Sequence, residues 1–134
     1  MKTRLQELET EESRRAVSEA LAAVFRQWQL SETDQAAALG VGEAPFLRTG
    51  EPVPRSDAVL TRAGHLLALG RALARLFPGE VHRAQAWVWA EHPQLAGYAP
   101  VTLMLGDLKG LERVRQLAEA EVTGDRHRPR GPLH

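Results

Sequence analysis

The chain has 134 residues with 17 basic and 17 acidic side chains, and this balance disfavours a protein that coats nucleic acid without specificity. It has no cysteine and no apolar run of membrane length, which excludes disulfides, thiolate metal sites and a transmembrane helix, so we expect a cytoplasmic protein. Hydrophobic residues make up 43% of the chain. Because Ala and Leu are strong helix formers and β-branched residues are few, the composition predicts an all-α fold.

The first 12 residues form a charged N-terminal arm in which acidic side chains outnumber basic ones. The arm is either a frayed end or a segment that pairs with a second copy. An amphipathic helix is expected over residues 13–28, with Ser13 as its cap. Its apolar side chains recur at helical spacing, at Val17, Leu21, Val24, Phe25 and Trp28.

A short second helix is expected between Ser31, which can cap it, and Gly40, which ends it. Ala36 and Gly40 have the spacing of a helix-turn-helix, in which a small residue allows close helix approach and glycine takes the turn. With a third helix over residues 42–50, the sequence predicts a helix-turn-helix-like subdomain that spans residues 13–50.

The third helix decides whether this subdomain reads DNA. A reading helix needs several basic or amide side chains, and residues 42–50 supply only Arg48. The candidate DNA contacts are Thr33, Gln35, Arg48 and Arg55. DNA reading and a purely structural helix-turn-helix both stay open, and we expect specific DNA binding by the chain alone to be weak or absent.

Residues 51–56 form a proline-rich connector, which is the expected boundary before a helical domain over residues 57–124. The longest helix is expected at residues 57–77. Apolar and small residues cover more than half of its circumference, which predicts burial between partners and at least a dimer. Its solvent side is marked by Arg62, Arg71 and Arg75.

The helix that begins near Glu80 carries two tryptophans, Trp87 and Trp89. His92 should end it, because a residue that precedes a proline is pushed out of the helical region. The two indole rings lie two positions apart and therefore point to different sides of the helix. One ring is therefore expected in the core and the other at least partly exposed or under a partner; burial of both is the alternative.

A tight loop, a short helix and a last helix follow. Gly97 and Tyr98 make the turn of the loop. Pro100 can open the short helix, because its missing N–H costs nothing in a first turn. Gly106 and Asp107 then end the short helix, and Asp107 can cap the last helix.

This order of residues resembles the toxin-binding module of the Xre–MbcA–ParS antitoxin family. The family places a Trp four residues before a Pro, then a Gly-containing loop, a Pro that opens a short helix, and a closing helix with Val and Leu. The matching residues are Trp89, Pro93, Gly97, Pro100, Leu103, Leu105, Gly106 and Val114. Because Trp89 takes the family's Trp position, the resemblance implies that Trp89 lies in the core and that Trp87 is the partly exposed interface aromatic. The stretch from Pro93 to Pro100 is shorter than the family's usual loop, which contains a Gly pair.

The N-terminal half resembles the same family, so the resemblance spans residues 20–124. The residues concerned are Trp28, Leu30, Ser31, Leu39, Gly40 and Val41. The resemblance implies an antitoxin of a type II toxin–antitoxin pair, which neutralises a RES-domain toxin that degrades NAD by occluding its active-site cleft. It also implies a homo-oligomer or a hetero-oligomer with the toxin, and autoregulation of the operon with operator DNA as a weak second partner.

Toxin neutralisation is then expected from residues 80–134. The interface candidates are Trp87, Gly97, Tyr98, Arg126, Arg128 and Arg130. The three arginines belong to a basic tail, residues 125–134, in which two prolines prevent a helix. This tail is either a disordered, solubilising end or a segment that meets acidic groups at the rim of the toxin's cleft.

No part of the sequence has the spacing of a catalytic or metal site. It has no phosphate-binding loop and no nucleophile elbow, and no His pair with the spacing of a metal site on a helix. We therefore expect a protein that is not an enzyme and that uses no catalytic residue, cofactor or metal. The alternative function is a helix-turn-helix transcription regulator that dimerises through its C-terminal half, and an adaptor for another protein is a third.

Overall fold

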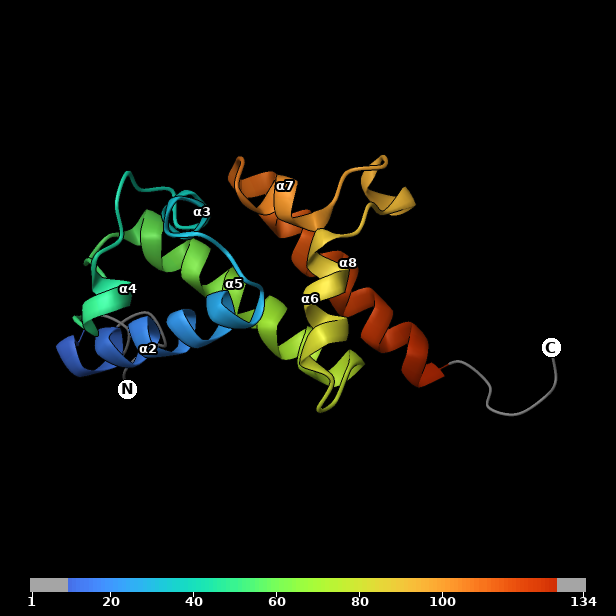
Figure 1. Ribbon diagram of the computed structural model, residues 1–134, viewed down its shortest axis with the longest axis horizontal. Helices are drawn as coiled ribbons and strands as arrows, with labels where there is room; N and C mark the ends of the chain where they lie inside the picture. Colours follow the sequence, from blue (N-terminus) through green and yellow to red (C-terminus); the bar gives the residue numbers. More distant parts are fainter. Residues whose placement is uncertain (1–9, 128–134) are drawn as a thin grey trace, which may run out of the picture.

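The computed structural model describes residues 10–127, and every regular element in this range is a helix (Figure 1). The predicted all-α fold is therefore confirmed for the described residues. None of these helices is long and apolar enough to cross a membrane. The elements in chain order are α2 (Glu11–Gln27), α3 (Glu32–Ala38), α4 (Phe46–Thr49), α5 (Asp57–Leu76), α6 (Val81–Trp89), the 3₁₀ turn η1 (Pro93–Leu95), α7 (Pro100–Met104) and α8 (Leu108–His127).

Helix α2 starts earlier than the sequence predicts. Thr10 caps it, because its Oγ1 accepts a hydrogen bond from the N–H of Ser13 at 3.1 Å, so Ser13 lies inside the first turn. Glu11 and Glu12 end the predicted charged arm but are helical, and they favour the positive end of the helix dipole. The rest of that arm, residues 1–9, lies outside the described residues.

The next two helices follow the predicted order, but α4 is a single turn. Ser31 caps α3 as predicted, accepting from the N–H of Asp34 at 3.1 Å. Gly40 ends α3 with a φ of 73°, a conformation that glycine adopts readily. Pro45 stands at the start of α4 and the left-handed Gly50 at its end, which leaves only four helical residues. Because a recognition helix must lie along the major groove, this short α4 leaves the helix-turn-helix interpretation unconfirmed.

Helix α5 is central to the described structure, with α2 and α4 on one side and α6 and α8 on the other (Figure 1). Ser56 caps it, its hydroxyl accepting from the N–H of Val59 at 3.3 Å. The wide apolar face that the sequence predicts is buried by neighbouring helices of the same chain. Its buried leucines are Leu60, Leu66, Leu69 and Leu73. The width of that face therefore gives no argument for a dimer.

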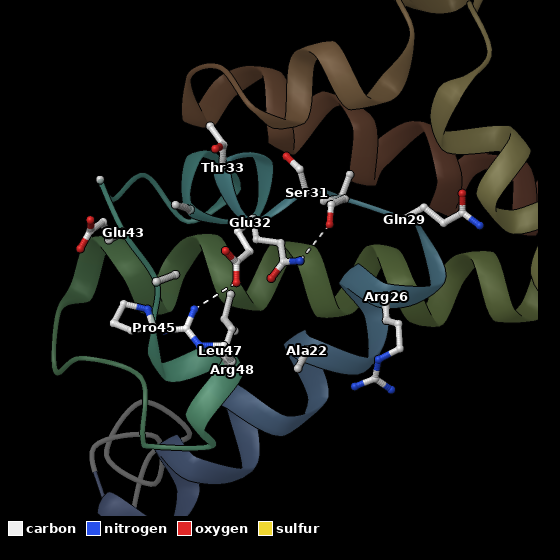
Figure 2. Close-up of a pocket in the computed structure, with 15 residues that line it drawn as sticks. Ala22, Arg26, Gln29, Ser31, Glu32, Thr33, Glu43, Pro45, Leu47 and Arg48 are labelled. Carbon is white, nitrogen blue, oxygen red and sulfur yellow. Dashed lines mark hydrogen bonds and ion pairs between the residues drawn. The ribbon is translucent and has the colours of Figure 1, made fainter.

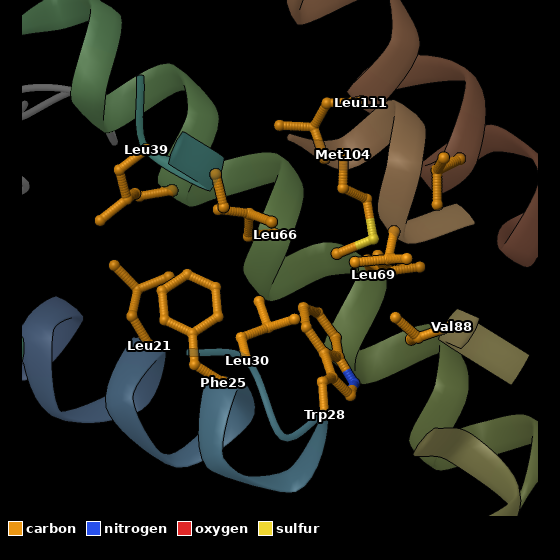
Figure 3. Close-up of a cluster of buried hydrophobic side chains, with 14 of the residues drawn as sticks. Leu21, Phe25, Trp28, Leu30, Leu39, Leu66, Leu69, Val88, Met104 and Leu111 are labelled. Atoms are coloured by element: carbon orange, nitrogen blue, oxygen red, sulfur yellow. The ribbon is translucent and has the colours of Figure 1, made fainter. Parts of the chain in front are cut away.

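One hydrophobic core extends from α2 to α8 (Figure 3). Its fully buried side chains come from both halves of the chain and include Phe25, Trp28, Leu39, Leu66, Met104 and Leu111. The connector at residues 51–56 also belongs to it. Val53 is buried, its N–H donates to the Arg14 carbonyl at 3.2 Å, and its own carbonyl accepts from Arg14 Nε at 2.9 Å. The connector is thus fixed along α2.

The C-terminal part has the predicted order of helix, loop, short helix, turn and helix. Pro100 is the first residue of α7, and Asp107 precedes α8, its Oδ1 accepting from the N–H of Gly110 at 2.8 Å. Helix α8 continues to His127, so the prediction that the last helix ends at residue 124 is wrong. Residues 125–127, which the prediction placed in the extended tail, are helical.

Candidate functional site

The segment between α6 and α7 forms a tight loop that projects away from α5 (Figure 1). His92 closes it with three backbone hydrogen bonds. Its carbonyl accepts from the N–H of Leu95 at 3.0 Å and of Gly97 at 2.9 Å, and its N–H donates to the Tyr98 carbonyl at 3.1 Å. Because these main-chain groups are satisfied within the loop, its shape is fixed before any partner binds.

The same loop exposes an aromatic side chain. Tyr98 is 54% exposed, whereas Leu95 is only 2% exposed and anchors the loop in the core. Ala96 and Gly97 both have left-handed backbones, with φ of 57° and 86°, which turn the chain between these two side chains. The structure thus brings the predicted candidates Gly97 and Tyr98 together on one rigid turn.

The two tryptophans of α6 have the opposite placement to the one predicted. Trp87 is 7% exposed, packs on the His92 ring at 5.1 Å between centroids, and donates from Nε1 to Glu121 at 3.2 Å. Trp89 is 43% exposed, although its Nε1 donates to the Trp28 carbonyl at 2.8 Å. Trp87 is therefore buried and packs against the loop through His92. The prediction that it is a partly exposed interface residue is wrong.

A local signal in α6 could have revealed this placement. The buried residues of the helix are Ala84, Trp87 and Val88, at the spacing of one helical face. Trp89 lies off that face. The spacing of Ala84, Trp87 and Val88 therefore predicts which tryptophan is buried better than the family's Trp position does.

The arginine candidates of the tail are only partly within the structure. Arg126 lies in the last turn of α8, which corrects the prediction that the extended tail begins at residue 125. Arg128 and Arg130 lie outside the described residues. The described side chains thus give no contact for this part of the predicted interface.

Three of the DNA-contact candidates lie around one groove, which α2, α3, α4 and the loop before α4 enclose (Figure 2). This α3–α4 groove holds a cavity of about 830 Å³ and is lined by Thr33, Gln35 and Arg48. Arg48 pairs with Glu32 at 3.0 Å, and Gln35 donates from Nε2 to the Leu30 carbonyl at 2.9 Å. Among these three side chains, Thr33 is the one that is exposed and makes no such bond to a described residue. The fourth candidate, Arg55, lies in the connector outside this lining.

Arg62 is a buried cation that the sequence analysis placed on the solvent side. It is 8% exposed, and its guanidinium donates to the Ala38 carbonyl at 2.6 Å and to the Met104 carbonyl at 2.8 Å. These carbonyls end α3 and α7, where a positive charge is favourable. Burial lowers the pKa of Arg62, and the charge of Asp107 opposes this shift. Its spacing of four from Leu66 and seven from Leu69 was the signal that could have placed it inside.

A second polar cluster joins α5 to α8. Arg115 donates from Nε to His65 Nδ1 at 2.7 Å and pairs with Glu119, while His65 Nε2 lies 3.9 Å from Glu112. Burial, followed by the Arg115 charge, lowers the pKa of His65. The neutral imidazole therefore fits this site, with Nδ1 as the acceptor.

The predicted site residues thus fall into two separate regions, the loop of residues 92–99 and the α3–α4 groove. Among the described side chains, those of residues 10–124, no group of three or more His, Cys, Asp or Glu could hold a metal ion. What the geometry offers is a rigid loop that exposes an aromatic residue, and a groove in which the candidates Gln35 and Arg48 are already engaged within the chain. Comparison with protein-family models and with curated proteins found no match to this chain.

Proposed function

We propose that the protein is the antitoxin of a type II toxin–antitoxin pair and that it neutralises a RES-domain, NAD-degrading toxin by covering the toxin's active-site cleft. The proposal starts from the resemblance carried by Trp89, Pro93, Gly97 and Pro100. The backbone of Ala96 and Gly97 also supports it, because two consecutive left-handed residues are the conformation that a glycine pair favours.

The observation that carries the proposal is the exposed Tyr98 on a loop with an internally satisfied backbone. Tyrosine offers a large contact area and loses little rotamer freedom on binding. A loop that is already ordered adds no further ordering cost when the complex forms. The combination is suited to insertion into a concave protein surface such as an enzyme cleft.

Inhibition by occlusion needs no catalytic group in the inhibitor. It needs a fixed shape and a slow dissociation rate, and both depend on buried support beneath the contact residue. Leu95 and Trp87 provide this support, because both are buried under the loop and Trp87 packs on His92. The described geometry is consistent with this mechanism.

The alternative, a DNA-reading regulator, has less support. Arg48 is engaged with Glu32, Gln35 with the Leu30 carbonyl, and α4 is one turn long. Glu32 and Glu43 also line the α3–α4 groove and offset the charges of Arg26 and Arg48, so this lining has no net positive charge to attract phosphate. Any action on the operon is therefore expected to need the toxin complex or a second copy.

The decisive experiment titrates the toxin's NAD-degrading activity with the wild type and with Tyr98→Ala. We expect the variant to inhibit roughly 10- to 100-fold more weakly, the range of a truncated aromatic hot spot. Val81→Ala is the matched control, because Val81 is an exposed apolar residue at the far end of α6. Equal inhibition by wild type and Tyr98→Ala would remove the loop from the mechanism, and high-affinity operator binding by the isolated chain would favour the regulator.

A further inference from the structure

The outer face of α5 borders a cavity of about 370 Å³, which we name the α5 pocket. Its lining comes from Val17 of α2, from Arg115 of α8 and from the face of α5 between Leu60 and Arg71. None of these residues belongs to the loop of residues 92–99 or lines the α3–α4 groove. The volume lies in the usual range of small-molecule sites, about 300–1,000 Å³, so the pocket is large enough for a small ligand.

Much of the lining is aliphatic, and a glycine lies within it. Val17 is buried, and Leu67 and Ala68 are half-buried. Gly64 is exposed, and a Cβ built on it would meet no other atom within 4 Å. The chain therefore leaves this space open. An alkyl group placed over Gly64 would remove aliphatic surface of the pocket from water, which is favourable.

The polar part of the lining favours an anion. Arg71 and Arg115 both line the pocket, and no carboxylate of the described residues does. Arg71 is exposed and forms no ion pair with another described side chain. Arg115 is already paired with Glu119, which lies outside the lining. One positive charge thus stays unpaired, and this matches a ligand with a single negative charge.

The guanidinium of Arg115 is oriented before any ligand binds. Its Nε donates to His65 Nδ1 at 2.7 Å, and its Nη1 donates to Glu119. Two bonds from one planar group set its orientation, and they leave Nη2 without a bond to a described residue. A carboxylate can accept from Nη2 without breaking either bond. Arginine therefore favours a carboxylate here, because its charge-assisted hydrogen bonds are strong and directional.

We propose that the α5 pocket binds a medium-chain carboxylic acid, with its alkyl chain over Gly64 and Leu67 and its carboxylate at Arg71 and Arg115. The proposal goes beyond the antitoxin proposal and uses no residue of the loop of residues 92–99, so either can fail without the other. The lining selects this ligand class. A cationic amphiphile would be repelled by Arg71, and inorganic phosphate would leave the aliphatic surface uncovered.

The first test compares three ligands that share one alkyl chain, namely octanoate, octan-1-ol and octylammonium. Each is titrated into the full chain and followed through the methyl resonances of Val17 and Leu67, which mark the pocket. Octanoate should bind at least about tenfold more tightly than the alcohol, because only the carboxylate pairs with arginine, and octylammonium should bind most weakly. Hexanoate should bind roughly tenfold more weakly than octanoate, because it lacks two buried CH₂ groups.

The second test removes the unpaired charge. Arg71→Gln should weaken the binding of octanoate about tenfold and leave the binding of octan-1-ol unchanged. The matched control is Arg75→Gln, one turn further along α5, because Arg75 lines a neighbouring cavity of about 260 Å³ and not the α5 pocket. This control should bind octanoate like wild type.

The third test fills the pocket without disturbing the fold. Gly64→Leu should raise the melting temperature, because Leu is a better helix former than Gly and the space above Gly64 is open. The same variant should weaken octanoate and octan-1-ol alike by at least about tenfold, because its side chain takes the place of the alkyl chain. Gly124→Leu makes an equivalent change at an exposed helical glycine of α8 and should leave both affinities unchanged.

Four results would overturn the proposal. These are octan-1-ol that binds as tightly as octanoate, Arg71→Gln that binds octanoate like wild type, Gly64→Leu that keeps wild-type affinity, and octanoate that leaves the resonances of Val17 and Leu67 unshifted. Circular dichroism on every variant ensures that lost binding is not a lost fold.

Discussion

The α3–α4 groove and the loop of residues 92–99 use their polar groups in opposite ways. In the groove, the side chains of Arg48 and Gln35 are engaged within the chain, with Glu32 and the Leu30 carbonyl. In the loop, the backbone is engaged and the side chain of Tyr98 is left in solvent. A binding surface needs side chains that are available and a backbone that is already satisfied. The loop has both properties, whereas Arg48 and Gln35 in the groove are already engaged within the chain.

The largest expected loss of stability comes from removing the buried tryptophan that packs against the loop of residues 92–99. Trp87→Ala should destabilise the fold by about 4 kcal/mol, because it removes a buried indole that packs on His92. Trp89→Ala, on the side that contacts α2, should cost only about 1 kcal/mol, since that ring is partly solvated and loses one hydrogen bond. Urea unfolding of both variants measures the difference. Equal losses would contradict the placement of the two rings.

The second prediction concerns Arg62, the buried cation that joins the end of α3 to the end of α7. Arg62→Ala should lower the free energy of unfolding by about 3 kcal/mol, because it leaves the buried carbonyls that end α3 and α7 without their charged donor. Arg113→Ala is the control, since Arg113 is exposed and makes only a 3.4 Å contact with the Gln94 carbonyl. If Arg62→Ala unfolds like this control, Arg62 does not hold the ends of α3 and α7 together.

A smaller effect should come from His65, which lies in neither region. Its pKa is lowered from 6.5 by burial and then by Arg115, although Glu112 and Glu119 oppose the shift and Arg62 adds to it. The folded chain therefore binds fewer protons at this residue than the unfolded chain does. The stability from the neutral ring is fully present above about pH 6.5 and is lost as the pH falls toward the lowered pKa.

The measurement for His65 is urea unfolding of the wild type and of His65→Gln between about pH 8 and pH 5. The wild type should lose more stability than the variant over the lower part of this range. Parallel pH profiles would show that the imidazole does not titrate in the way its contact with Arg115 requires.

The smallest expected changes in stability come from one left-handed backbone position in each region. Gln29 borders the α3–α4 groove with a φ of 58°, and Ala96 lies in the loop with a φ of 57°. Replacing either with Gly should raise the free energy of unfolding by about 0.5 kcal/mol, because a left-handed backbone is unfavourable for a residue with a Cβ. Thermal unfolding of the two single variants and their double variant checks that the gains add, as expected for separate regions. A loss of stability in either variant would contradict the assigned backbone.

Much of the candidate site could be predicted from the sequence, because its loop is built from local signals. Pro93, Gly97 and Pro100 restrict the backbone near their own positions, and the turn and short helix occur where these residues predict them. The exposure of Tyr98 within the turn also follows from its local surroundings. The partner proposed for this loop rests on the family resemblance, which the fold alone does not test.

The same local reasoning explains the caps that were predicted correctly. Ser31 and Asp107 each accept a hydrogen bond from a backbone N–H three residues on, and this interaction requires no other part of the chain. The errors at Ser13 and at the end of α8 are shifts along a helix, where neighbouring residues have similar propensities.

The sequence by itself thus determined the helices, their order and the turns between them, because propensity, capping and proline geometry act within a few residues. Periodicity indicated an apolar face on these helices, and only the tertiary structure decided which neighbours cover it. Whether Trp87 or Trp89 is buried depends on where α8 and α2 lie, and Arg62 is buried because the ends of α3 and α7 converge on it. These contacts join residues far apart in the sequence, and their free energies depend on the packing of the whole core.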